Sequence, residues 1–216
     1  MKKLFFVLLI IGSFVAAKAQ KADPFLPEIK NFKKQDSLQF PPKNAVLFIG
    51  SSTFTKWKDA QKYFPGHVIV NRGFGGSSLP NVIDHVGDVV FPYAPKQVVI
   101  YCGENDFGGG ASVDEVVSRA KKLIDTIRSQ YPKVYIAYIS IKPSPSRVKY
   151  LPMMKEANQK IEALVKGLKR AVFINTADSM YDADGTIKKD IFLSDNLHMN
   201  AKGYEIWKGI MEPYLR

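Results

Sequence analysis

Five short apolar runs, separated by helical patterns, are the feature of this sequence that most restricts its fold. Most of the runs lack a polar residue at every second position and are rich in β-branched and aromatic residues. Runs of this kind are typical of parallel strands that are buried on both faces. The predicted strands cover residues 44–50, 67–72, 97–102, 133–139 and 171–175.

Helical patterns lie between and after these runs. Apolar residues recur at helical spacing over 112–130 and 150–168, and Ser112 stands where it can cap the first of these helices. A last helix is expected after Asn200, and the segment 53–64 places three aromatic side chains on one face. Strands that alternate with helices predict an α/β fold, with one parallel sheet of about five strands and helices on both faces. In such sheets, functional sites form beyond the carboxyl ends of the strands.

The start of the 216-residue chain is typical of a secretory signal: two lysines, an apolar stretch at 4–17 and a small-x-small cleavage pattern at 17–19. The apolar stretch is shorter than the ~20 residues that a membrane-spanning helix needs, so an uncleaved anchor is disfavoured. We therefore expect an exported protein, periplasmic or extracellular, with no stable membrane span after cleavage. The predicted divisions are a signal peptide at 1–19, a lead-in segment lying over the body at 20–43, and one domain at 44–216.

The chain is basic, with a formal net charge of +11. Its lysines are spread along the sequence, and neither an aromatic-basic motif nor a known reader module accompanies them, so we expect no nucleic-acid partner. A solvated basic surface is the preferred interpretation. The sequence makes no prediction of oligomeric state.

No cofactor or metal site is predicted. The first strand is not followed by the glycine pattern of a dinucleotide site or by a phosphate-binding loop. The Asp-Ala-Asp-Gly stretch at 182–185 hints at calcium, but the other ligands of the known loop are missing, so a turn is expected. Cys102 is the one cysteine, and its place in an apolar run favours packing over a nucleophilic role.

Polar residues follow four of the predicted strands. The fourth of these groups contains Asp195 and His198, whose spacing of three residues lets both side chains face the same way in a turn. The carboxylate would then hold one ring nitrogen and leave the other as a base, which requires a hydroxyl or thiol to activate. The alternative is that Asp195 only caps the following turn.

Two serines follow the first strand. Ser51 and Ser52 stand where the strand turns into a helix, and the free N–H groups at that point stabilise a developing oxyanion. Both serines could equally be helix caps, and the local sequence does not choose between them.

The ends of the second and third strands supply candidate oxyanion donors. The Gly75-Gly76 backbone can approach a ligand closely because it has no Cβ, and the Asn105 amide offers an uncharged N–H. The alternatives are a tight turn for the glycines and a locally bonded loop amide for Asn105.

These four groups, in this order, resemble the sequence blocks of the SGNH/GDSL hydrolases, which are esterases and acylhydrolases with a flavodoxin-like three-layer α/β/α fold. The resemblance runs from residue 46 to about 208. The family's Gly-Asp-Ser block corresponds here to 50–52, which implies that Ser52 is the nucleophile and that Ser51 replaces the family's aspartate.

The resemblance also implies the other roles. Asp195 and His198 match the family's Asp-x-x-His block and would complete a Ser-His-Asp triad. The oxyanion hole would use the backbone N–H groups of Ser52 and Gly76 with the side chain of Asn105, in the intact Gly-x-Asn-Asp block at 103–106.

The expected function is a secreted serine esterase acting on a small-molecule or glycan ester. No long apolar lid segment is apparent, so short acyl groups are preferred, such as acetyl on carbohydrate. Arg72, Phe74 and Phe107 are candidate substrate contacts, and the loop 107–112 would line the mouth. The alternative is that both aromatics are core residues and that Arg72 pairs with an acid such as Asp106.

Two other functions fit the same motifs. One is a lysophospholipase- or thioesterase-like lipid acylhydrolase, and the other is a catalytically inactive glycan-binding protein on the same fold. Because the proposed base must be neutral, an esterase should lose activity as the pH falls and His198 takes up a proton. An activity maximum below about pH 5, well under the reference histidine value of about 6.5, would contradict this.

Overall fold

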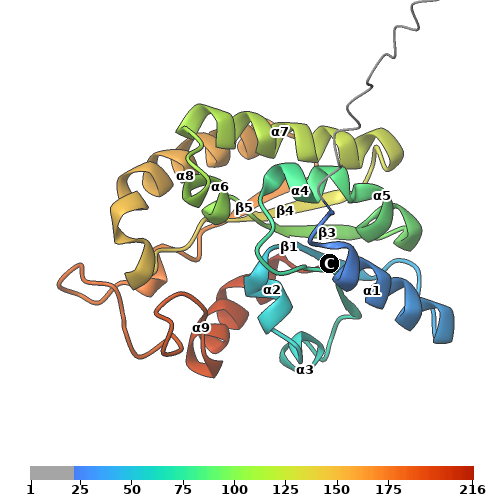
Figure 1. The fold of residues 1–216 in the computed structure, drawn as a ribbon, viewed down its shortest axis with the longest axis horizontal. Coiled ribbons are helices and arrows are strands. Elements are labelled where there is room, and N and C mark those ends of the chain that lie inside the picture. Colours follow the sequence, from blue (N-terminus) through green and yellow to red (C-terminus); the bar gives the residue numbers. More distant parts are fainter. Residues whose placement is uncertain (1–21) are drawn as a thin grey trace, which may run out of the picture.

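The computed structural model describes residues 22–216, so the predicted signal at 1–19 lies outside the described residues. One parallel sheet of five strands forms the centre of the fold, with the strand order β2-β1-β3-β4-β5 (Figure 1). The strands are β1 (Val46–Gly50), β2 (Ile69–Asn71), β3 (Gln97–Tyr101), β4 (Tyr135–Ile139) and β5 (Ala171–Ile174). Within residues 22–216, every helix is too short or too polar to span a bilayer.

The five predicted strands are thus confirmed, each one to three residues shorter than its apolar run. Every residue of β1 and β3 is buried, because these two strands lie inside the sheet and are covered on both faces. The sheet reverses its direction of growth between β1 and β3. This switch point is where sites form in doubly wound folds, and the same strand order is that of flavodoxin-like proteins.

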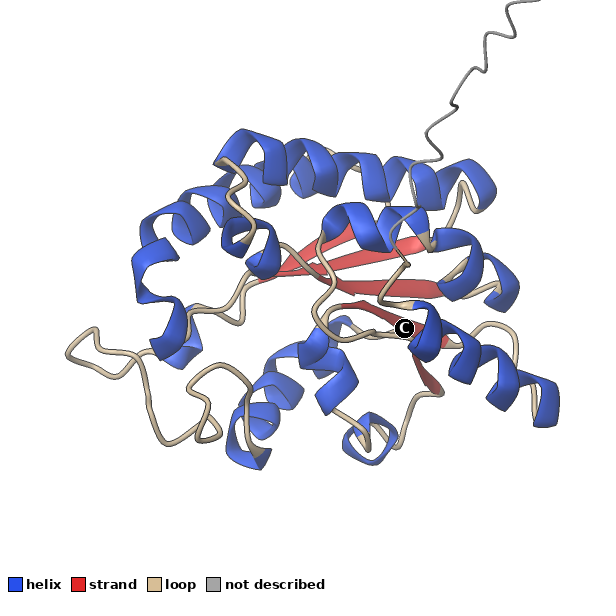
Figure 2. Ribbon diagram, viewed as in Figure 1, coloured by secondary structure: helices blue, strands red, loops and turns tan. Residues whose placement is uncertain are grey.

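Helices cover both faces of the sheet, which gives the predicted three layers (Figures 1 and 2). The larger core joins the sheet to one helical layer, and the smaller core joins it to the other. The first layer holds α4 (Leu79–Asp84), α5 (Val86–Val89), α7 (Val113–Gln130) and α8 (Leu151–Lys166). The second holds α2 (Ser52–Lys56), α3 (Ala60–Tyr63) and α9 (Ala201–Met211), while the short α6 (Glu104–Gly108) follows β3.

The predicted cap of the helix at 112–130 is confirmed. The Ser112 side chain accepts a hydrogen bond from the Glu115 backbone N–H, and the Glu115 carboxylate accepts one from the Ser112 N–H. This reciprocal pair satisfies two N–H groups that the helix itself cannot use. Its buried face includes Val116, Ala120 and Leu123.

The segment 53–64 is not one helix but two short ones. Phe54, Trp57 and Phe64 are all buried, as their shared face predicted. The Asn71 side-chain amide donates to the carbonyl oxygens of Phe54 and Trp57. In a continuous helix, these two carbonyl oxygens would instead accept from backbone N–H groups further along the helix. A residue of β2 therefore ends α2, which no local pattern could indicate.

The lead-in segment forms a helix, α1 (Leu26–Leu38), that the sequence pattern does not predict. It buries Ile29 against the larger core and pairs Asp36 with the buried Arg72 of the β2 end. The helix is polar on average: Ile29 is its one buried residue, and the Asp36–Arg72 ion pair ties it to the end of β2. The sequence boundary of this segment stays a prediction.

Candidate active site

Ser52 lies at the carboxyl end of β1, as the first residue of α2. Gly50 makes this turn possible: its φ is +132°, and a Cβ there would lie 1.9 Å from the Tyr101 carbonyl oxygen. The Ser51 N–H donates to that same oxygen over 3.1 Å. As the first helical residue, Ser52 has a backbone N–H with no acceptor inside the helix.

The two serines have different environments. Ser51 is 3% exposed and precedes the helix with extended backbone, but its side chain makes no capping hydrogen bond. Ser52 is partly exposed, and its hydroxyl points to the histidine described next. The structure therefore does not bear out the capping alternative for Ser51, and it singles out Ser52 as the reactive candidate.

His198 and Asp195 lie in a turn that follows β5 and precedes α9. The turn closes on itself: the Leu193 N–H donates to the His198 carbonyl over 2.8 Å, and the Asn196 N–H donates to the Leu193 carbonyl over 2.9 Å. Asn196 has a φ of +55°, in the left-handed region that asparagine tolerates better than most residues. Asn200 then caps α9 by accepting from two of its backbone N–H groups.

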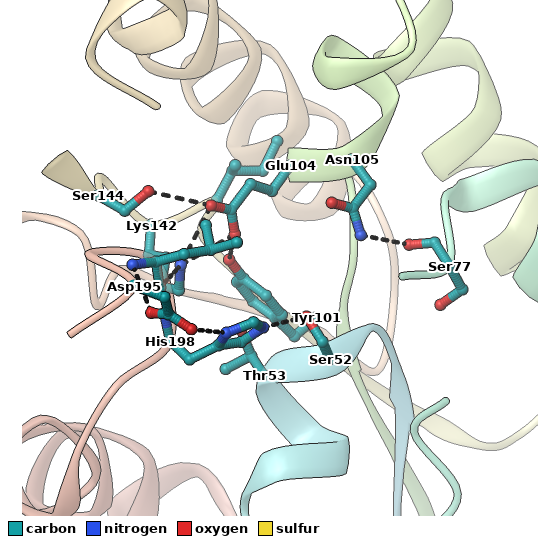
Figure 3. A network of polar contacts seen from close by, with 12 residues as sticks. Ser52, Thr53, Ser77, Tyr101, Glu104, Asn105, Lys142, Ser144, Asp195 and His198 are labelled. Carbon is teal, nitrogen blue, oxygen red and sulfur yellow. Dashed lines mark hydrogen bonds and ion pairs between the residues drawn. The ribbon is translucent and has the colours of Figure 1, made fainter. Parts of the chain in front are cut away.

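The three side chains form one line of hydrogen bonds (Figure 3). His198 Nδ1 lies 2.6 Å from Asp195 Oδ2, and His198 Nε2 lies 2.9 Å from Ser52 Oγ. A neutral ring with its proton on Nδ1 donates to Asp195 and leaves Nε2 to accept the Ser52 proton. This arrangement can generate an alkoxide-like nucleophile and store its proton on the ring.

Asp195 is held in its charged form. Partial burial acts to raise the pKa of Asp195, but hydrogen bonds from the His198 ring and from the backbone N–H groups of His198 and Leu197 outweigh it. Together they lower the pKa of Asp195 to about 2. The carboxylate therefore stays ionised at any pH where an imidazole can act as a base.

Ser77 joins the first three sequence blocks at the candidate oxyanion hole. Its hydroxyl lies 3.0 Å from the carbonyl oxygens of both Gly50 and Phe74, and its own carbonyl accepts from the Asn105 amide over 3.1 Å. One of the two amide N–H bonds of Asn105 is used in this way, and the other is left for a ligand. The neighbouring Gly76 is exposed, with a φ of +75°.

A cavity of about 270 Å³ lies beside Asn105. Its walls come from the start of α4, from α6 and the glycine-rich loop, and from the start of α7: Ser78, Asn105, Asp106, Gly109, Gly110, Ala111, Glu115 and Arg119. Three residues of the loop 107–112 line this cavity, but Ser52 and His198 do not, so the place of the loop at the mouth of the active site stays a prediction.

The three predicted substrate contacts lie in the protein interior. Phe74 is fully buried and Phe107 is 1% exposed, so neither ring reaches a ligand at the surface. Arg72 is also buried: it pairs with Asp36 and donates from Nε to the Tyr93 hydroxyl over 2.8 Å. The structure contradicts these contacts and favours the alternative in which all three residues support the fold.

The suggested pairing of Arg72 with Asp106 is also wrong. The Asp106 carboxylate pairs with Arg119 over 2.9 Å and accepts from the Leu79 N–H at the start of α4, also over 2.9 Å. Burial raises the pKa of Asp106, although these two partners oppose the shift. Asp106 therefore ties α4 and α7 to the block that carries Asn105.

The remaining candidates have structural roles. Cys102 is fully buried, burial raises the pKa of its thiol, and its Sγ contacts the Ser77 carbonyl at 3.7 Å. The Asp182–Gly185 stretch is a turn in which the Asp184 carboxylate accepts from the Thr186 N–H and hydroxyl. Among residues 22–216, no group of three or more histidine, cysteine, aspartate or glutamate side chains gathers that could hold a metal ion.

Two further polar residues contact the site and were not predicted from the sequence. Lys142 and Glu104 form a buried ion pair behind His198, and Lys142 reaches the turn that holds the histidine (Figure 3). A lysine three residues after an apolar strand was the available signal, but it resembles any surface lysine until its partner is known.

Comparisons with known proteins find relatives of this chain in sequence and in fold. Over 171 residues the chain is 26% identical to platelet-activating factor acetylhydrolase IB subunit alpha1 of Pongo abelii, covering 74% of this chain and 70% of that protein. A structure from Streptococcus pneumoniae, whose name refers to platelet activating factor, superposes with a TM-score of 0.78 at 23% identity, covering 89% of this chain and 92% of the other.

A carbohydrate esterase family 3 structure from Talaromyces cellulolyticus superposes with a TM-score of 0.63 at 16% identity, covering 78% of this chain and 94% of the other. The sequence model of the GDSL-like lipase/acylhydrolase family matches residues 36–206, from α1 into α9. That range contains every element of the site described above, and the chain belongs to the GDSL-like lipase/acylhydrolase family.

Proposed function

We propose that this protein is a secreted serine esterase that removes short acyl groups, foremost acetyl, from carbohydrate. The observation that carries the proposal is the continuous line from Ser52 Oγ through the His198 ring to the Asp195 carboxylate. The line lies at the carboxyl edge of the sheet, where folds of this kind bind their ligands. Export is supported by the signal-like pattern at 1–19.

In the first half-reaction, Ser52 Oγ attacks the ester carbonyl carbon while His198 Nε2 takes the hydroxyl proton. The carbonyl oxygen becomes an oxyanion, which the backbone N–H groups of Ser52 and Gly76 and the Asn105 amide stabilise. Asp195 stabilises the charged imidazole. His198 then gives its proton to the departing alcohol oxygen, and an acyl-serine is left.

In the second half-reaction, a water molecule replaces the alcohol. His198 takes a proton from this water as it attacks the acyl carbon, and the same donors hold the second oxyanion. Return of the proton to Ser52 Oγ releases the carboxylic acid and restores the starting enzyme.

The surroundings of Asn105 support a short acyl group. The cavity beside this candidate oxyanion donor, whose lining does not include Ser52 or His198, is small and its walls are largely polar or glycine, which suits an acetyl group better than a long hydrocarbon chain. The names of the relatives point the same way, because one is an acetylhydrolase and another a carbohydrate esterase. The acetylhydrolase also makes an acetyl ester of a lipid-like alcohol the second candidate substrate.

The test is a panel of esters that varies one part at a time. Acetylated sugars, acetylated glycerolipids and aryl acetates vary the alcohol, and aryl esters of two to twelve carbons vary the acyl chain. We expect kcat/KM to be highest for acetyl esters and, among these, for acetylated sugars. If only aryl or long-chain esters are hydrolysed, the carbohydrate acetyl assignment is wrong.

A further inference from the structure

Lys142 is a charged side chain placed where a charge is costly. It follows β4, its side chain is fully buried, and its Nζ lies 3.0 Å and 3.2 Å from the two carboxylate oxygens of Glu104. An apolar side chain of similar volume is often as stabilising as such a pair or more so. Stability alone therefore does not account for a lysine at this position.

Glu104 fixes one end of the pair to the block that carries the oxyanion donor. Its carboxylate accepts from the Tyr101 hydroxyl over 2.8 Å and from the Ser144 hydroxyl over 3.2 Å, in addition to Lys142. Glu104 directly precedes Asn105 at the start of α6. The acid is thus held by three donors, next in the chain to the residue that offers the oxyanion amide.

The third contact of Lys142 reaches the histidine turn. Its Nζ donates to the Leu197 carbonyl oxygen over 2.8 Å, while the N–H of the same peptide unit, that of His198, donates to Asp195 Oδ1 over 2.9 Å. Because the peptide unit is planar, fixing both polar groups fixes the plane that holds the His198 Cα, from which the side chain leaves the backbone.

The setting of the turn explains why such an anchor matters. Residues 193–196 are exposed, and the side chain of Asp195 is 46% exposed, so water competes for the hydrogen bonds at that side. The Lys142 ammonium is shielded from water and approaches from the protein interior (Figure 3). It thus contacts, from the buried side, a turn whose residues 193–196 are exposed.

We propose that Lys142, held by Glu104, is a positioning residue for ester hydrolysis: it orients the Leu197–His198 peptide so that His198 Nε2 meets Ser52 Oγ. The inference rests on the proposed function, since it assigns a role in that reaction. It also links the two halves of the site, because one buried ammonium joins the Asn105 block to the histidine turn.

The experiment compares three variants with the wild-type protein, using an aryl acetate as substrate. Lys142→Met removes the ammonium and leaves the buried Glu104 carboxylate without its cation, which destabilises the fold. The double variant Lys142→Met/Glu104→Gln removes both charges and keeps the volume, so it is the decisive variant. Glu104→Gln alone keeps a lysine nitrogen that still donates to Leu197.

We expect kcat of the double variant to fall between about 10-fold and 100-fold with KM within about twofold, because misplacing a reacting group costs rate rather than binding. Glu104→Gln alone should lose less. The control is Asp36→Asn, which breaks another buried ion pair, with Arg72, far from the histidine turn. It should lower the thermal stability and leave kcat unchanged.

A second readout does not depend on activity. In the resting protein, the proton on His198 Nδ1 should give a downfield NMR signal from its hydrogen bond to Asp195. This signal should weaken or shift in the double variant and stay in Asp36→Asn. A folded double variant with wild-type kcat and an unchanged signal would overturn the positioning role. A wild-type protein that hydrolyses no ester would instead defeat the proposed function, and the NMR signal would still decide the positioning.

Discussion

The two turns that supply the triad are built by opposite means. The Ser52 turn continues a buried strand, with Gly50 and Ser51 locked against the Tyr101 backbone and the Tyr204 hydroxyl donating to the Thr53 carbonyl over 2.8 Å. The His198 turn is irregular and exposed: backbone hydrogen bonds close it, and two side chains hold the Leu197–His198 peptide, Asp195 from outside and Lys142 from inside. The nucleophile is thus positioned by the fold itself, and the base by a few polar side chains. Damage to the first turn should cost stability, and damage to the second should cost rate.

The largest effect is expected at the exposed turn. Asp195→Asn should lower kcat by about 10⁴-fold, because the amide no longer favours the required ring tautomer and cannot stabilise the imidazolium. Thermal stability should change little, since the side chain is half exposed. The matched control is Asp190→Asn, an exposed aspartate in the same loop, which should keep full activity. Equal losses of rate in both variants would mean that the loop, rather than the triad, is sensitive.

The opposite result is expected at the buried turn. In Gly50→Ala the new Cβ would lie 1.9 Å from a backbone oxygen, at a φ that side chains rarely adopt. We expect a loss of more than about 4 kcal/mol in the free energy of unfolding, measured by urea denaturation. Gly87→Ala is the matched control, because a Cβ there meets nothing within 4 Å. A Gly50→Ala protein as stable as wild type would refute the account of this turn.

Asn105 is expected to show an effect between those of the two turns. It lies on the largely buried helix α6, and one N–H of its side-chain amide is left for a ligand. Asn105→Ala should lower kcat by about 10²–10³-fold with little change in KM, because an oxyanion donor acts mainly in the transition state. Loss of its bond to the Ser77 carbonyl should cost about 1 kcal/mol of stability, so the melting temperature must be recorded as well. A rise in KM at constant kcat would place Asn105 in substrate binding instead.

The smallest expected effect is the change of kcat/KM with pH, which tests whether Asp195 stays charged. The pKa of Asp195 is lowered to about 2, so this carboxylate stays charged through the assay range. Asp195 should then add nothing to the acid limb of kcat/KM, which is expected to have a slope of one and about a tenfold loss per pH unit. A steeper limb would show that a second group titrates, and an activity maximum below about pH 5 would contradict a neutral base.

Much of the fold could be predicted from local patterns. The strands followed from apolar runs, and the cap of α7 from Ser112 and its helical stripe. The triad residues needed the family resemblance as well, because Ser51 and Ser52 are equivalent in local sequence. The structure distinguishes them independently of the family, by the 2.9 Å contact of Ser52 Oγ with His198 Nε2.

The errors have a common physical cause. The sequence predicts Arg72 as a substrate contact. Its partner is instead Asp36, which lies 36 residues earlier, on a helix that the sequence pattern does not predict. Lys142 was overlooked because Glu104 and Leu197 lie 38 and 55 residues away. Phe74 and Phe107 follow strand ends yet turn inward. Local sequence predicts where a strand ends, but which distant side chain a residue meets depends on the packing of the whole chain.

The central claim is that Ser52 is the nucleophile, and covalent labelling tests it most directly. Wild type, Ser51→Ala and Ser52→Ala should each be treated with a fluorophosphonate, and the adduct located by mass spectrometry of peptides. The account predicts a single adduct on Ser52 in wild type and in Ser51→Ala, and none in Ser52→Ala. A folded wild-type protein that takes up no label, as a glycan-binding protein on this fold would, or an adduct on another residue, would contradict it.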